Sequence, residues 1–375
     1  MAYLAWLLLV LLVGSAVFCV LVIVAARDYL AQRPRLSQGL VPFSILKPLA
    51  GFDEGLEQNL RSFFEQRYPC FEIVAAVRNE ADPAAAVFRQ LQREYPQVPS
   101  RLLLVGEPPY ANAKVWSLER MTAEAQHDLL VMSDSDIRVT AEMLGVLATE
   151  FADPRLGVST CPYRAVSGSS IWSRLEAVGM NTEFLSGVLV ARLLDGMKFA
   201  LGPTISARKQ AVADAGGWPD LARFLAEDFV LGNRAAEKGW AVLLSCYVIE
   251  HRIGSEGFRV NARHRLRWFR STRRSRPAGY VGQLFTNPTP LLVILTILCP
   301  SWWPWMLALL SVRFAAALAC WIWILRDRNW LSHLWLLPLQ DLLSFAFWVA
   351  GFFGNSIEWR GRRYRLHADG TFTPT

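Results

Sequence analysis

Two aspartates stand one residue apart in the stretch VMSDSDIRV, residues 131 to 139. Asp134 and Asp136 follow the apolar run DLLVM, a pattern typical of a buried strand. Hard divalent cations prefer oxygen ligands and are often held by one or two carboxylates together with the phosphates of a substrate. The pair therefore predicts a site for Mg²⁺ or Mn²⁺ that also contacts a diphosphate. The alternative is a short solvated surface turn, and the spacing alone leaves both interpretations open.

The chain around these aspartates, from about 40 to 280, alternates short apolar runs with helical patterns. Strands are predicted at 43–49, 72–78, 101–106 and 128–134, and helices at 55–66, 83–95, 112–126 and 140–152. This βαβα order predicts an α/β fold with a mainly parallel sheet covered by helices. Ligands of such sheets bind beyond the carboxyl ends of the strands, where Asp134 and Asp136 are expected.

Residues 1 to 26 carry no charged side chain and predict a membrane-spanning helix. At about 1.5 Å per residue this helix is about 39 Å long, longer than a hydrocarbon core of about 30 Å. A cleaved signal peptide would instead have a basic start and a shorter apolar core. The next residues, RDYLAQRPR, supply Arg27, Arg33 and Arg35 against Asp28. The positive-inside rule therefore places the following domain, 40–255, in the cytosol.

A second hydrophobic block covers residues 284–354. Within it, 305–325 and 334–354 are each long enough to cross a membrane. The piece 284–303 either crosses or forms a re-entrant or interfacial element, because two prolines stand near its start. The tail 355–375 is more basic than the RDRN loop, which predicts a cytosolic C-terminus. The sequence thus predicts a multi-pass membrane protein with its α/β domain on the cytosolic face.

Composition and missing motifs exclude several classes of protein. The six cysteines are scattered without a C-x-x-C pair, so neither a zinc site nor a disulfide framework is indicated. The net charge of +7 is concentrated beside the hydrophobic segments, where anionic lipid explains it better than nucleic acid does. A P-loop run is absent, and the first strand is followed by KPLAGFDEG rather than a dinucleotide-binding glycine turn.

Four short motifs follow one another over about 220 residues: KPL-G-D, D-x-D, E-D-F in AEDFVLG, and R-W in HRLRW. The series resembles the ceramide glucosyltransferase family and its bacterial relatives, the hopanoid-associated glycosyltransferases, and the end WRGRRYRL is similar to that family's end. The resemblance implies a GT-A type glycosyltransferase domain, a UDP-sugar donor and a lipid acceptor.

The resemblance implies roles for acidic residues of the predicted domain. Asp134 and Asp136 would contact the metal, although the second position is not acidic in some ceramide enzymes. Asp228 would be the catalytic base, which takes a proton from the acceptor hydroxyl in an inverting transfer. Alternatively, Glu227 and Asp228 are solvated acids in the first turn of a helix, where they suit the helix dipole. Asp82 would help to hold the nucleotide, or it caps the helix that follows it.

Lys114 and His251 can each be interpreted in two ways. Lys114 stands where the family carries a lysine, which implies a charge near the diphosphate, and its alternative is an exposed helix lysine. His251 ends the run AVLLSCYVIEH, where it either approaches the metal or diphosphate or caps a strand.

The last motif departs from the family pattern of Gln or Arg, two residues, then Arg-Trp, because His264 holds the first position. The resemblance implies that Arg267 stabilises charge on the leaving diphosphate and that Trp268 lines the acceptor site. His264 would bind substrate by donating a hydrogen bond. Residues 252–276 hold nine arginines and one acid, so 256–283 is also predicted as a basic amphipathic segment on anionic lipid.

The expected function is therefore transfer of a hexose, with glucose favoured, from a UDP-sugar to a hydroxyl of ceramide. One alternative enzyme moves N-acetylglucosamine to a hopanoid polyol. A processive polysaccharide synthase is disfavoured by the few membrane segments. A non-catalytic membrane scaffold, with the acids as surface charge, is the alternative from another class.

Overall fold

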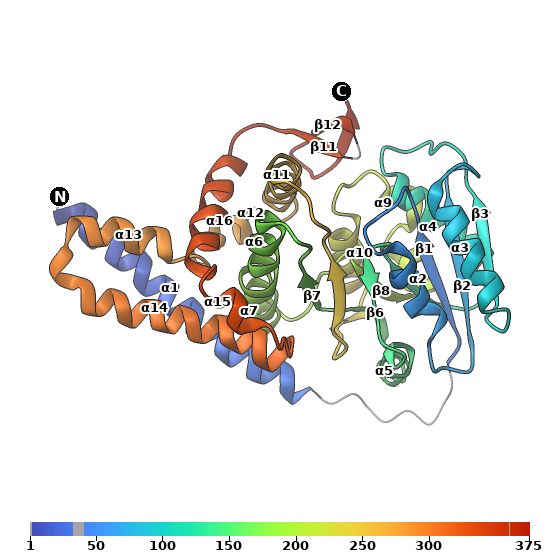
Figure 1. The fold of residues 1–375 in the computed structure, drawn as a ribbon, viewed down its shortest axis with the longest axis horizontal. Helices are drawn as coiled ribbons and strands as arrows, with labels where there is room; N and C mark the ends of the chain where they lie inside the picture. Colours follow the sequence, from blue (N-terminus) through green and yellow to red (C-terminus); the bar gives the residue numbers. More distant parts are fainter. Residues whose placement is uncertain (1, 33–40, 360) are drawn as a thin grey trace. The chain divides into compact units, whose positions relative to one another are not determined.

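The computed structural model describes residues 2–32, 41–359 and 361–375, which form two compact units (Figure 1). Unit 1 comprises Met1–Gln32, Arg164–Gly196 and Ser255–Arg363. Unit 2 comprises Arg33–Tyr163, Met197–Gly254 and Tyr364–Thr375. Arg33, Arg35 and Arg360, on which part of the predicted membrane orientation depends, lie outside the described residues.

Unit 2 is built on a seven-stranded sheet with the order β3-β2-β1-β4-β8-β6-β9. The first four strands in this order are parallel to one another, as are β6 and β9, whereas β8 is antiparallel to both of its neighbours. The strands are β1 Phe43–Pro48, β2 Phe71–Val77, β3 Ser100–Leu104, β4 Leu129–Ser133, β6 Leu156–Thr160, β8 Thr204–Arg208 and β9 Ala241–Leu244. The α/β fold with a mainly parallel sheet is confirmed, and the four predicted strands lie within two residues of the observed ends.

The helices of unit 2 are α2 Leu56–Phe64, α3 Pro83–Glu94, α4 Ala113–Glu124, α5 Met143–Glu150, α8 Lys209–Asp214, α9 Gly217–Leu221 and α10 Glu227–Glu237. Two of them start at side-chain caps, because the carboxylate of Asp82 accepts from Ala84 N and the amide oxygen of Asn112 accepts from Val115 N. Their apolar faces pack on strands that are buried along their whole length, such as β1 and β4. Short strands β5 (Ile137–Arg138) and β10 (Ile249–Arg252) pair antiparallel beside the main sheet.

Strand register brings three loops of unit 2 to one edge of the sheet. In the parallel pair β1–β4, Leu46 stands opposite Met132, so both strands end at the same edge. In the antiparallel pair β4–β8, Ser133 stands opposite Thr204, which brings the start of β8 to that edge as well. The residues that follow β1 and β4 therefore meet those that precede β8.

Unit 1 consists mainly of apolar helices. Its elements are α1 Ala2–Ala31, α6 Ile171–Gly179, η1 Met180–Phe184, α7 Leu185–Asp195, α11 Phe258–Ser275, α12 Pro277–Gly282, η2 Gln283–Phe285, α13 Thr289–Leu298, η3 Pro300–Trp302, α14 Trp303–Leu318, η4 Ala319–Ile324, α15 Trp330–Leu334, α16 Leu337–Gly351 and strand β11 Ser356–Trp359. Helices α1, α13 and α14 lie side by side (Figure 1), joined by a cluster that includes Leu8, Leu292 and Met306. Other large apolar side chains of α1 and α14 remain exposed, as expected of helices that face lipid.

Three helical stretches within the described residues are long and apolar enough to cross a membrane: Tyr3–Ala31, Ile171–Asp195 and Pro300–Ile324. A fourth results if the pair Pro277–Phe285 and Thr289–Leu298, bent by 48°, is one span. The predicted span 334–354 contains only the 15-residue helix α16, shorter than the roughly 20 residues that a crossing needs. The stretch Ile171–Asp195 lies inside the range 40–255 that is predicted as the cytosolic domain. The sequence did not predict it as a span, because Arg174, Glu176 and other polar residues interrupt its apolar run.

Arginines of α11 bind α16 and the residues that follow it within unit 1. Arg265 is buried, and its guanidinium donates two hydrogen bonds of 3.1 Å to Gln340 Oε1, near the start of α16. Beyond the end of α16, Arg270 donates to the carbonyl of Phe353 at 3.1 Å, and Arg273 donates to that of Gly354 at 2.9 Å. Part of the predicted basic surface is thus used inside the unit.

Candidate active site

Asp134 lies where β4 ends and meets the loops of two neighbouring strands. Its backbone N–H donates to the carbonyl of Pro203, just before β8, at 3.1 Å. Its own carbonyl accepts a 2.5 Å hydrogen bond from Lys47 Nζ, on β1. The Lys47 amine lies 3.9 Å from the ring centre of Phe63. Burial lowers the pKa of Lys47 to about 7, although the negative charges of Asp134 and Asp136 act in the opposite direction. These contacts use the backbone of Asp134 and leave its carboxylate for the pair with Lys114.

Lys114, on the first turn of α4, joins Asp134 to a second acidic residue. Its Nζ lies 2.8 Å from Asp134 Oδ1 and 3.6 Å from Glu227 Oε1. It also donates to the carbonyl of Gly202 at 3.3 Å. Burial opposes the charge of Lys114, but Asp134 and Glu227 outweigh burial and raise its pKa. The side chain is only 20% exposed, so the interpretation of Lys114 as an exposed helix lysine is wrong.

Glu227 and Asp228 open helix α10. Burial raises the pKa of Glu227 to about 7, although Lys114 acts in the opposite direction. Asn112 holds this side chain by donating to Glu227 Oε2 at 3.1 Å. Burial likewise raises the pKa of Asp228 above its usual value. Glu227 is 12% exposed, so its carboxylate is not a solvated surface acid.

Glycines allow α10 to approach the loop before β8. A Cβ atom at Gly202 would lie 2.7 Å from Asp228 Oδ2, so this carboxylate rests directly on the glycine backbone. A Cβ atom at Gly232, one turn further along α10, would collide with the backbone of Phe199 and Ala200. Gly202 also accepts from Lys114, so this glycine joins Asp228 to the lysine that pairs with Asp134 and Glu227.

Asp136, the second aspartate of the D-x-D pair, contacts His251. Pairing of β5 with β10 places Ile137 opposite His251, and the Asp136 Oδ2 atom lies 3.0 Å from His251 Nε2. Burial opposes ionisation, but the charge and hydrogen bond of His251 hold the pKa of Asp136 below its usual value. The other oxygen, Oδ1, is buried and has no hydrogen-bond partner among the described residues. His251 therefore approaches the predicted metal-binding pair rather than only ending a strand.

Asp82 serves as the N-cap of α3, as one of its two interpretations predicted. Its carboxylate also accepts from the backbone N–H of Gly51, at 3.0 Å to Oδ1, and so ties the loop after β1 to the start of α3. A contact with the nucleotide remains a prediction.

His264, Arg267 and Trp268 belong to unit 1, whereas the other predicted site residues belong to unit 2. His264 and Trp268 lie on one face of α11 with ring centres 4.3 Å apart, and His264 Nδ1 lies 2.9 Å from Glu176 Oε1 on α6. The Arg267 guanidinium stands 5.8 Å from the ring centre of Trp359. Within unit 1 the three side chains of the last motif are thus presented by one helix.

Residues 6–372 match the model of glycosyl transferase family 21. The chain belongs to this family. It is 28% identical over 206 residues to ceramide glucosyltransferase 1 of Caenorhabditis elegans, which covers 54% of this chain and 44% of that protein. It is 35% identical over 105 residues to a ceramide glucosyltransferase of Komagataella phaffii, which covers 27% and 21% respectively. The chain thus spans about half or less of the length of these relatives.

The fold of this family 21 glycosyltransferase is similar to that of a mannosyltransferase from Pyrobaculum calidifontis, solved in complex with GDP-Man and Mn²⁺. The TM-score is 0.56 at 16% identity, over 93% of this chain and 97% of that one. The similarity confirms the GT-A-like fold.

Two residues of the candidate site were not predicted. Lys47 belongs to the KPL motif, and a lysine inside a buried run is itself a signal, because lysine is almost never fully buried unless it is paired. Asn112 is the first residue of the helix predicted over 112–126, whereas the structure makes it the N-cap of α4, a position that asparagine favours. Its contact with Glu227, 115 positions away, could not be predicted from local pattern.

Proposed function

We propose that this glycosyltransferase moves a hexose from a UDP-sugar to a hydroxyl of a membrane lipid with inversion at the anomeric carbon. Glucose is the proposed sugar and ceramide the proposed acceptor. The observation that carries the proposal is the arrangement around Lys114, which pairs with Asp134 and donates to the carbonyl of Gly202, the residue against which Asp228 rests. This arrangement lies at the edge of the sheet where α/β folds bind ligands. The names of the curated relatives support the choice of sugar and lipid.

Asp228 is the proposed base. An inverting transfer needs a carboxylate within hydrogen-bond reach of the acceptor hydroxyl, and its efficiency improves as its pKa approaches the working pH. Burial raises the pKa of Asp228, which is the direction that the second condition requires. Asp228 takes the hydroxyl proton while the oxygen attacks the anomeric carbon from the face opposite the leaving UDP, which gives a β-glycoside. Lys114 is proposed to contribute positive charge near the diphosphate, because it lies beside the proposed metal ligand Asp134.

Asp134 and Asp136 would hold Mg²⁺ or Mn²⁺. The buried, unpartnered Oδ1 of Asp136 fits such a cation, because a carboxylate oxygen is a hard donor and gains a partner when the ion binds. Within residues 2–32, 41–359 and 361–375, no three His, Cys, Asp or Glu side chains form a complete metal site. That suits a cation whose remaining ligands come from the donor diphosphate. When bound, the ion would neutralise charge on the departing UDP.

Unit 1 is proposed to lie in and on the membrane, with unit 2 on the cytosolic side. Its candidate spans and exposed apolar helices support this placement. From unit 1, Arg267 is proposed to stabilise the leaving diphosphate, Trp268 to line the acceptor site and His264 to bind substrate. In unit 2, Asp82 is proposed to contact the nucleotide.

The test uses the full chain purified in detergent, with Mn²⁺ or Mg²⁺. UDP-glucose, UDP-N-acetylglucosamine and GDP-mannose are each combined with ceramide and with a hopanoid tetrol, and products are identified by mass spectrometry. Glucosylceramide is the expected product, and Asp228→Asn should abolish it while the folded protein remains. Product from another pairing would correct the substrates. Absence of product from every pairing, or an active Asp228→Asn variant, would overturn the enzyme proposal.

A further inference from the structure

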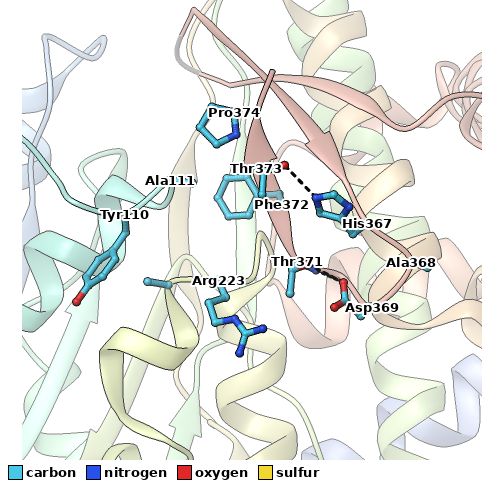
Figure 2. Close-up of a pocket in the computed structure, with 11 residues that line it drawn as sticks. Tyr110, Ala111, Arg223, His367, Ala368, Asp369, Thr371, Phe372, Thr373 and Pro374 are labelled. Atoms are coloured by element: carbon cyan, nitrogen blue, oxygen red, sulfur yellow. Dashed lines mark hydrogen bonds between the residues drawn. The ribbon is translucent and has the colours of Figure 1, made fainter.

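The last residues of the chain form a hairpin in unit 2. Strand β12 (Arg362–Leu366) pairs antiparallel with β13 (Phe372–Pro374), with Leu366 opposite Phe372. The hairpin has its own small core, because Tyr364, Leu366 and Phe372 are buried and the rings of Tyr364 and Phe372 lie 5.2 Å apart. The turn is fixed by Asp369, whose carboxylate accepts from Thr371 N and Thr371 Oγ1 (Figure 2).

This hairpin binds the loop that leads into α10. The N–H of Phe372 donates to the carbonyl of Arg223 at 3.2 Å, and the N–H of Leu225 donates to the carbonyl of Gly370 at 3.5 Å. Between these two bonds, Phe224 and Thr371 form an antiparallel bridge. Residues 223–225 of the loop therefore act as a short extra strand on the hairpin. This strand ends at Leu225, two residues before Glu227.

Asn112 holds the same loop from the side of the active site. This fully buried amide donates to the carbonyl of Phe224 at 3.1 Å and to Glu227 Oε2 at 3.1 Å, while its oxygen caps α4. Phe224 is thus fixed on one side by the residue that also orients Glu227, and on the other by the hairpin.

A hollow of about 820 Å³ lies beside these contacts (Figure 2). It is lined by Tyr110 and Ala111 before α4, by Ala222 and Arg223 of the loop, and by the hairpin. The hollow leaves one side of the loop open, while Ala222 and Leu225 are buried on the core side. The hydrogen bonds with the hairpin and with Asn112 therefore add to this core packing in fixing the backbone of the loop.

We propose that the C-terminal hairpin, residues 364–375, is a positioning element for the reaction: it fixes the loop 222–226 and thereby sets where Glu227 and Asp228 stand against Lys114 and Gly202. The proposal rests on the function proposed above for Asp228. Small displacements of a catalytic group can cost up to about 100-fold in rate, so a distant clamp can control turnover.

The test compares three variants of the full membrane protein. A chain that ends at Leu366 loses the loop contacts. Phe372→Pro removes the N–H that donates to Arg223, and Phe372→Leu is its matched control, because it keeps both an apolar side chain in the hairpin core and the N–H. The truncated and Phe372→Pro proteins should lose about 10-fold to 100-fold in kcat, with KM for the UDP-sugar changed less than about twofold. Phe372→Leu should lose much less.

Hydrogen exchange of the same proteins keeps this proposal separate from the proposed function. Amides of residues 222–230 should exchange faster in the truncated and Phe372→Pro proteins, while those of β1 and β4 keep their wild-type rates. If the wild type transfers no sugar in any pairing, the function fails and the exchange result alone decides the positioning role. Unchanged exchange at 222–230, unchanged kcat, or equal effects of Phe372→Pro and Phe372→Leu would each overturn it.

Discussion

Asp228 lies directly against Gly202: a methyl group on this glycine would stand 2.7 Å from the carboxylate oxygen Oδ2. The α carbon of Gly202 thus packs against the carboxylate of the proposed base. The carbonyl of Gly202 accepts a hydrogen bond from Lys114. No other residue type fits without moving the carboxylate.

Gly202→Ala should therefore displace Asp228 and lower kcat by about 10-fold to 100-fold, with little change in thermal stability. Gly145→Ala is the matched control, because a Cβ atom there meets open space inside α5. That change should leave kcat unaltered and stabilise the fold by roughly 0.5–1 kcal/mol. Equal kinetics for both variants would show that Asp228 does not depend on this contact.

The raised pKa of Glu227 predicts a pH dependence of stability. Burial moves the pKa from its usual 4.5 to about 7, so between these values the folded state binds more protons than the unfolded state. The contribution of Glu227 to the free energy of unfolding is therefore fully present below about pH 4.5 and is lost as the pH rises to about 7.

Glu227→Gln should remove this loss of unfolding free energy with rising pH. Between pH 4.5 and 7, the unfolding midpoint of the variant should therefore fall less than that of the wild type. Glu237→Gln removes an exposed carboxylate from the other end of α10 and should keep the wild-type behaviour. Denaturant unfolding in detergent at several pH values measures both. Parallel curves for the wild type and Glu227→Gln would contradict the prediction.

The first four strands and the first four helices of unit 2 could be predicted from sequence, since alternation of apolar runs and helical spacing is a local signal. The contacts of Lys47 with Asp134 and of Asn112 with Glu227 could not, because they depend on strand register and on residues far apart in the chain. The candidate span Ile171–Asp195 was missed for a different reason. Its mean hydropathy of 1.2 is well below the 3.2 of Tyr3–Ala31, because polar residues such as Glu176, which contacts His264 of α11, interrupt its apolar run.

Removal of the Asp136 carboxylate should weaken metal binding. Asp136→Asn replaces one of the two oxygens with an amide nitrogen, a poor ligand for a hard cation, so Mn²⁺ binding in the presence of UDP should fall below detection. His251→Gln should weaken Mn²⁺ by about 10-fold to 100-fold, as loss of a partner that orients a ligand does. Asp128→Asn, just before the opposite end of β4, is the control and should bind normally. Electron paramagnetic resonance titration of free Mn²⁺ measures all three, and tight binding by Asp136→Asn would remove this residue from the metal site.

A buried ion pair joins two helices of unit 1, and its loss should destabilise that unit. Arg313 NH2 lies 2.8 Å from Asp341 Oδ1, both side chains are at most 2% exposed, and Asp341 also accepts from Thr289 Oγ1 at 2.7 Å. Asp341→Asn leaves the guanidinium buried without its counter-charge, which should cost about 3–5 kcal/mol of unfolding free energy. The double variant Arg313→Met, Asp341→Leu buries no charge and should recover most of that stability. Unfolding in detergent micelles checks both. If the double variant were as unstable as Asp341→Asn, packing at these positions rather than the uncompensated charge would set the stability of unit 1.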